Sequence, residues 1–137
     1  MAGPGLLALV VRSKRDADAA KAMLRTFYSG WDVDVHTLHG ARRADEALRE
    51  LKGIVSRDRF YLVMLGREDR VLAEELDRAL PPNVAVHVVP RARVRNARME
   101  QLAHEFDVAR SRIRLAAGWD QGRRAFVLGL RLGTPLE

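Results

Sequence analysis

Arginine is the residue type in this chain with the clearest chemical potential. Arg91, Arg93 and Arg95 stand at alternate positions after an apolar run, and further basic residues follow each of the other apolar runs. The planar guanidinium group donates two parallel hydrogen bonds, which suits phosphate. We therefore predict phosphate contacts at these segments. The predicted phosphate or nucleic-acid ligands are Arg12, Lys14, Arg15, Arg42, Arg43, Arg67, Arg91, Arg93, Arg95, Arg112, Arg114, Arg123 and Arg124.

The net charge fits the same hypothesis without establishing it. The chain has 24 Lys+Arg against 18 Asp+Glu, a formal charge of +6, and only three of its basic residues are lysines. Such a composition favours RNA or another polyanion as partner. It is equally typical of a protein from a GC-rich genome or a thermophile.

Motifs for catalysis are missing. Arg12 to Asp16 stand where nucleotide-binding folds carry a glycine-rich loop, but the segment has no glycine and matches neither GxGxxG nor the Walker pattern. The Ser-Gly-Gly-x-Asp-Ser signature of PP-loop ATPases is also absent. The chain has no cysteine, and its serines lack a nucleophile-elbow context. We predict no catalytic residue and no cofactor, and favour a non-catalytic domain while leaving an enzyme open.

A metal site is the weaker interpretation of the histidines. Asp34, His36, His39 and His87 could meet at strand ends, but no ligand motif accompanies them. We therefore predict surface histidines and no metal.

The elements that position these residues follow from hydrophobic periodicity. Leu6 to Val11, Phe60 to Leu65 and Val84 to Val89 are continuous apolar runs typical of buried parallel strands, and Trp31 to Leu38 alternates like an edge strand. Helical stripes lie between them: from a cap at Ser13 or Asp16 to Ser29, after Gly40, and from Leu72 to Leu80. This order predicts an α/β fold, a three-layer sandwich with a mainly parallel, Rossmann-like sheet of βα units.

The last third of the chain predicts a helix followed by a hairpin. Asn96 is a candidate cap for a helix that buries Leu102 and Phe106. The period-two pattern of residues 112–115 and the apolar residues 125–130 predict a C-terminal antiparallel hairpin. Its arginines would form a basic ribbon, with Trp119 near the tip to stack on bases. Gln101 to Ile113 also fit a helix-turn-helix, although Asp107 replaces the usual glycine.

A family resemblance covers the same region. Asn96-Ala97, Leu102-Ala103, Ser111-Arg112-Ile113 and Gly118 occur in the order found in the carboxyl half of YggU-like small proteins, which residues 84–130 resemble. The function of that family is obscure. The resemblance therefore implies a helix followed by a hairpin and no particular activity.

Domain organisation and location follow from length and composition. We expect one α/β domain over residues 1–132 and a frayed tail over 133–137. The longest uninterrupted apolar run, Leu6 to Val11, is too short to cross a bilayer. The residues before it lack a basic signal-peptide segment, so we expect a cytoplasmic protein without a membrane partner. A homodimer is left open.

Three functions remain compatible with the sequence. The leading hypothesis is a nucleic-acid-binding domain that contacts the phosphates of RNA, such as tRNA or another structured RNA, within a larger RNA-processing or modifying protein. The second is a nucleotide- or phosphometabolite-binding enzyme that uses the carboxyl edge of the sheet. The third is a protein interaction module whose basic surface meets an acidic partner.

Overall fold

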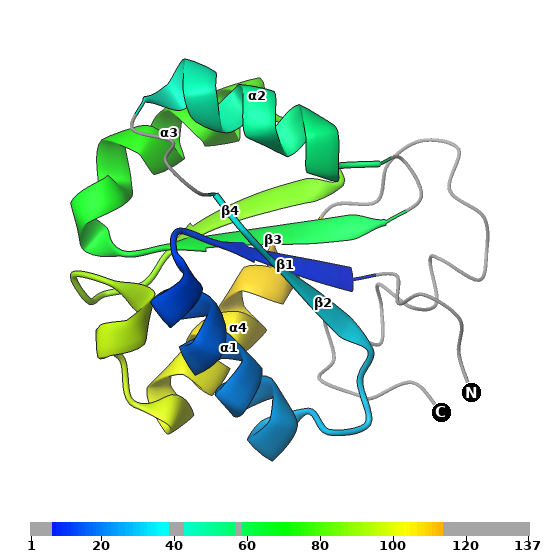
Figure 1. Ribbon diagram of the computed structural model, residues 1–137, viewed down its shortest axis with the longest axis vertical. Helices are drawn as coiled ribbons and strands as arrows, with labels where there is room; N and C mark the ends of the chain where they lie inside the picture. Colours follow the sequence, from blue (N-terminus) through cyan, green and yellow to red (C-terminus); the bar gives the residue numbers. More distant parts are fainter. Residues whose placement is uncertain (1–6, 39–42, 57–58, 114–137) are drawn as a thin grey trace.

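The computed structural model describes residues 7–38, 43–56 and 59–113, in which strands and helices alternate (Figure 1). The strands are β1 (Leu7–Val11), β2 (Val33–Thr37), β3 (Phe60–Leu65) and β4 (Val84–Val88). The α-helices are α1 (Lys14–Phe27), α2 (Ala44–Ile54), α3 (Arg70–Ala79) and α4 (Met99–Ser111), and two short 3-10 turns are η1 (Arg67–Asp69) and η2 (Val94–Asn96).

The four described strands form one parallel sheet in the order β2-β1-β3-β4. Helices α1 and α4 cover one face, and α2 and α3 cover the other (Figure 1). Leu9 and Leu62 pack with α1 and α4, whereas the alternate positions Val10 and Val63 pack with α2 and α3. The predicted three-layer α/β sandwich is therefore confirmed.

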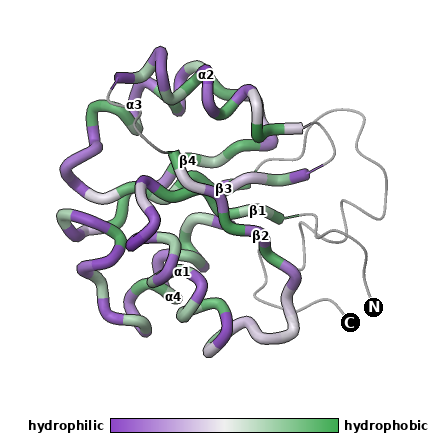
Figure 2. Tube along the Cα trace, in the orientation of Figure 1, coloured by the Kyte–Doolittle hydropathy of each residue, from purple (hydrophilic) through white to green (hydrophobic). Residues whose placement is uncertain are grey.

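Strand composition follows strand position. β1 and β3 are central and buried at every residue. Helices cover both faces of these strands, so apolar side chains are favoured at every position. β2 lies at the edge, where Val33 and Val35 are half-buried and Asp34 is exposed, as its alternating pattern predicts. Figure 2 shows the same contrast, with hydrophobic strands inside and hydrophilic stretches on the outer sides of the helices.

The beginning of α1 also agrees with the sequence. Ser13 takes the N-cap position, and its hydroxyl accepts a hydrogen bond from the Asp16 N–H at 3.2 Å. Of the two predicted caps, Ser13 is therefore the one used. The helix ends at Phe27, two residues before the predicted stop at Ser29.

The region around α4 corrects the sequence analysis. Asn96 closes the η2 turn and does not cap α4, which starts at Met99 with Arg98 before it. The helix is continuous to Ser111, so the helix-turn-helix interpretation is wrong. Arg112 has helical backbone angles and Ile113 is buried, so the predicted strand does not begin at Arg112. The rest of the predicted hairpin and the domain end at residue 132 lie outside the described residues.

The sheet topology decides where a ligand would approach. The chain leaves β1 for α1 on one face and leaves β3 for α3 on the other. The carboxyl ends of these neighbouring strands therefore form the switch point at which α/β sheets usually bind ligands. Within the described segments, no helix is long and apolar enough to span a membrane.

Candidate nucleic-acid interface

Two of the loops at the carboxyl edge of the sheet are joined through their backbones. The Arg67 N–H donates to the Arg91 carbonyl at 2.6 Å, and the Glu68 N–H points to the Ala92 carbonyl at 3.4 Å. Gly66 allows this approach, because a Cβ there would lie 2.6 Å from the Cα of Arg93. The loops after β3 and β4 are therefore held together by backbone hydrogen bonds.

Arg12 and Arg93, both predicted phosphate ligands, are engaged by carboxylates in this unit. Arg93 binds Asp69 at 3.2 Å and Glu68 at 2.6 Å, and Arg12 lies 3.7 Å from Asp69. Arg12 also donates to the Leu38 carbonyl at 3.4 Å. Both guanidinium groups therefore hold loops together, and much of their charge is balanced locally.

The loop after β4 is also attached to the first turn of α1. Asp16 is 1% exposed, and its Oδ1 accepts the Arg95 N–H at 3.0 Å, which holds η2 beside that turn. The side chains of Lys14, Arg15 and Arg95 are exposed there. This buried carboxylate thus positions basic residues that lie far apart in the sequence.

The first turn of α1 and the loops after β3 and β4 carry the exposed cations that we call the α1–η2 basic patch: Lys14, Arg15, Arg67, Arg91 and Arg95. Among the described residues, none of the five forms an ion pair with a carboxylate; Arg91 instead donates to the Gln101 side-chain amide oxygen at 3.0 Å. All five were predicted as phosphate ligands. The sequence therefore identified cations that the fold brings to one edge.

The remaining predicted ligands lie elsewhere. Arg43 stands at the start of α2 and pairs with Asp45 and Glu46 at 3.3 and 3.2 Å. Arg112 follows α4 and donates to the Val86 carbonyl at 3.5 Å, along the outer edge of β4. Arg112 therefore lies at a helix end and not on the predicted strand, and the rest of the predicted basic ribbon lies outside the described residues. Arg42, Arg114, Trp119, Arg123 and Arg124 lie outside the described residues.

A hollow beside the switch point has the opposite charge. It lies between the beginnings of α2 and α3 and is lined by one arginine and four carboxylates: Arg43, Asp45, Glu68, Asp69 and Glu75. An anionic small molecule would meet net negative charge there. In the part of the chain that the structure describes, no group of three or more His, Asp or Glu residues is placed to hold a metal ion.

Two polar clusters were not predicted. His87 on β4 and Glu105 on α4 are both buried and form a 2.7 Å hydrogen bond between Nε2 and Oε1. The prediction of a surface position for His87 is wrong, because His87 is buried and its side chain contacts α4. His87 lies on the same face of its strand as Ala85 and Val89, and this shared apolar face was the signal in the sequence for burial.

The second cluster joins the end of α1 to α4. The Tyr28 hydroxyl donates to Asp107 at 2.5 Å, and the buried Arg110 guanidinium binds the same carboxylate and lies 4.8 Å from the centroid of the Trp31 ring. Burial, followed by the hydrogen bond to Asp107, raises the pKa of Tyr28 to about 12. Tyr28 therefore stays neutral at physiological pH and ties the two helices together.

Comparison with known proteins supplies no function for this arrangement. No protein-family model, curated protein or solved structure matches the chain significantly. The resemblance of residues 84–130 to YggU-like proteins therefore stays a prediction, and functional inference rests on the geometry alone.

Proposed function

We propose that this protein binds the phosphate backbone of RNA, with tRNA or another structured RNA as the favoured class, through the α1–η2 basic patch. The observation that carries the proposal is the grouping of five exposed cations on the first turn of α1 and the two adjoining loops after β3 and β4, none paired with a carboxylate of the described residues. Cations without acidic partners attract phosphate and release counterions when they bind it.

The same geometry favours RNA over sequence-specific DNA binding. α4 is continuous and buries Leu102 and Phe106 against the sheet. Among the described residues it therefore offers no free recognition helix for the major groove. Contacts limited to the backbone suit structured RNA, which proteins recognise largely by shape. We place the domain within a larger RNA-processing or modifying protein.

The alternative of a phosphometabolite enzyme is less well supported. The hollow beside the switch point is lined by one arginine and four carboxylates, so its net negative charge repels phosphate. The exposed cations lie beside α1 and η2 instead. An extended polyanion can bind such an open edge without a pocket.

The proposal is tested by titrating the chain with labelled tRNA, single-stranded RNA and duplex DNA at about 50 and 200 mM salt. Lys14→Gln/Arg15→Gln/Arg95→Gln is expected to weaken RNA binding about tenfold or more at the lower salt. The slope of the logarithm of the association constant against the logarithm of the salt concentration should also become less negative by about 2, because each lost phosphate contact removes about 0.7 to 0.9 from its magnitude.

The matched control is Arg49→Gln/Lys52→Gln/Arg78→Gln. It removes one lysine and two arginines, as the test variant does, from exposed positions on α2 and α3. The control should retain affinity within about twofold, since it leaves the phosphate contacts intact. If both variants weaken RNA binding equally, the loss comes from the lower net charge and not from the α1–η2 basic patch. If none of the three nucleic acids binds, the proposal is refuted.

A further inference from the structure

The outer edge of β2 offers backbone groups for pairing. Leu38 directs its N–H to the Val11 carbonyl of β1 at 2.9 Å. Successive residues of a strand point their backbone groups to opposite sides, so Val33 and Val35 direct theirs away from the sheet. Within the described residues, β2 pairs with β1 alone.

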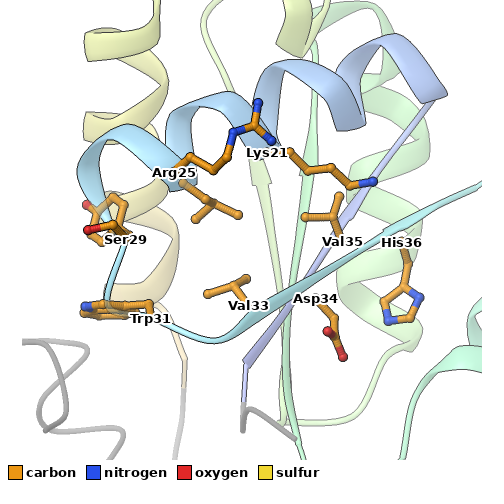
Figure 3. A pocket seen from close by; sticks show the side chains of 10 residues that line it. Lys21, Arg25, Ser29, Trp31, Val33, Asp34, Val35 and His36 are labelled. Atoms are coloured by element: carbon orange, nitrogen blue, oxygen red, sulfur yellow. The ribbon is translucent and has the colours of Figure 1, made fainter. Parts of the chain in front are cut away.

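A groove runs beside this edge, between β2 and the second half of α1 (Figure 3). Its volume is about 800 Å³. Four residues of β2 line the strand side of the groove: the side chains of Val33 and Val35 face α1, and those of Asp34 and His36 are directed to the other face of the strand (Figure 3). The groove therefore combines an apolar wall with an open strand edge.

The helix side of the groove is amphipathic. Lys21, Leu24, Arg25 and Tyr28 line it at spacings of three, one and three residues, which place them on one stripe of α1. Leu24 continues the apolar wall, while Lys21 and Arg25 are exposed and have no ion-pair partner among the described residues. A ligand in the groove would thus meet apolar surface below and positive charge on the α1 side.

At the opposite edge of the sheet, a charged side chain covers part of the outer side of β4. The Arg112 guanidinium donates to the Val86 carbonyl of β4 at 3.5 Å. Soluble proteins commonly block edge strands with such charged side chains. On the β2 side, the Asp34 carboxylate is directed to the other face of the strand and binds Arg59 at 2.8 Å. The two edges therefore differ, and β2 is the one that the described residues leave available.

We propose that the groove between α1 and β2 binds an extended acidic peptide segment of a partner protein by adding a strand to β2. Backbone hydrogen bonds to Val33 and Val35 would supply the pairing, as in other strand-addition sites. The peptide side chains that face α1 would be both apolar and acidic, because residues two apart along a strand share a face. The apolar ones would pack on Leu24 and the two valines, and the carboxylates would reach Lys21 and Arg25.

Charge favours this occupant over a second copy of the chain. Pairing β2 with β2 of another copy would bring two sets of Lys21 and Arg25 together, in a chain that already carries +6. Like charges at such an interface weaken association. The groove uses the second half of α1 and a different loop set from the α1–η2 basic patch, so the inference does not depend on RNA binding.

The probe is a fluorescein-labelled peptide that carries valine and glutamate in turn at every second position, with threonine between them, so that valine and glutamate share one face of the strand. Its binding to the full chain is measured by fluorescence anisotropy. Two comparison peptides are used: one with lysine in place of glutamate, and one N-methylated at alternate amides to block strand pairing. The glutamate peptide should bind at least tenfold more tightly than either. In amide hydrogen exchange, the Val33 and Val35 N–H groups should become protected when it binds.

Matched variants of α1 locate the site. Lys21→Gln/Arg25→Gln should weaken the glutamate peptide at least fivefold without changing RNA binding. Lys14→Gln/Arg15→Gln, which removes the same two residue types from the same helix, should leave peptide affinity unchanged. Circular dichroism of each variant checks that it is folded.

Several results would overturn the inference. Equal binding of the glutamate and lysine peptides would remove the charge argument, and equal binding of the N-methylated peptide would exclude strand addition. Concentration-dependent dimerisation that protects Val33 and Val35 without peptide would show that a second copy fills the groove. Loss of RNA binding in Lys21→Gln/Arg25→Gln would make the groove part of a nucleic-acid surface.

Discussion

Gly66→Ala is expected to destabilise the protein by about 3 kcal/mol, at the upper end of the usual cost of adding a methyl group to a packed interior. A Cβ at this position would lie 2.6 Å from the Cα of Arg93 and 2.7 Å from the carbonyl carbon of Ala92. The obstacle is backbone, which cannot rotate away as a flexible side chain can. The loops after β3 and β4 must therefore separate.

Gly53→Ala provides the control for this substitution. Gly53 lies within α2, and a Cβ there meets nothing within 4 Å. Because alanine is a better helix former than glycine, Gly53→Ala should stabilise the protein by about 0.5 to 1 kcal/mol. Urea unfolding followed by circular dichroism measures both changes. A Gly66→Ala variant as stable as the unmodified chain would contradict the joined-loop arrangement.

Gly66→Ala also tests how the basic patch is assembled. Separating the two loops would break the bond from the Arg67 N–H to the Arg91 carbonyl and loosen the Arg93 contacts with Glu68 and Asp69. If RNA binds the patch, affinity should fall in Gly66→Ala and persist in Gly53→Ala, although neither substitution changes a charge.

Hydrophobic periodicity was sufficient to predict the architecture where it extended over a whole element. β3 begins at Phe60 and ends at Leu65, as its apolar run predicts. The pattern failed at Arg112 because a period of two over four residues is too short to exclude a helix. Leu102, Phe106 and Ile113 continue the buried stripe of α4 past Ser111, and that longer repeat determines the local structure.

The sheet topology places the arginine-containing loops at one edge, as the sequence predicts, whereas their binding of phosphate stays a prediction. The βα order alone places the arginine-containing loops at one edge of a parallel sheet. It does not reveal which arginines meet acids, because Arg12 and Asp69 become neighbours only when β1 and β3 pair. The attachment of Arg95 to the buried Asp16 is likewise a tertiary contact without a local signature.

His87→Leu is expected to destabilise the protein by about 3 to 5 kcal/mol, because it leaves the Glu105 carboxyl group buried without its partner. The exposed fractions of the two side chains are 6% and 12%. The double variant His87→Leu/Glu105→Leu should recover most of this loss, since two apolar side chains in contact leave no buried polar group unpaired. A double-mutant cycle measures the coupling.

The pH dependence follows from the state of His87. Burial lowers the pKa of His87 below its usual 6.5; electrostatic repulsion from Arg112 and His104 adds to this effect, and the hydrogen bond to Glu105 and the charge of Glu105 oppose it. Nδ1 is buried and has no partner among the described residues, so a proton there would find no acceptor. The folded protein therefore favours the neutral ring, with Nε2–H donating to Glu105.

It follows that the unfolded chain takes up a proton at pH values where the folded protein does not. The free energy of unfolding should be highest above about pH 6.5 and fall as the pH decreases through 6 towards 5, by at most about 1.4 kcal/mol per unit for one proton. Urea titrations between pH 5 and 8 measure this slope. The double variant keeps the other histidines but lacks His87, so its slope should be shallower. If the two slopes coincide, His87 is protonated in the folded protein and its ion pair with Glu105, not a neutral hydrogen bond, joins β4 to α4.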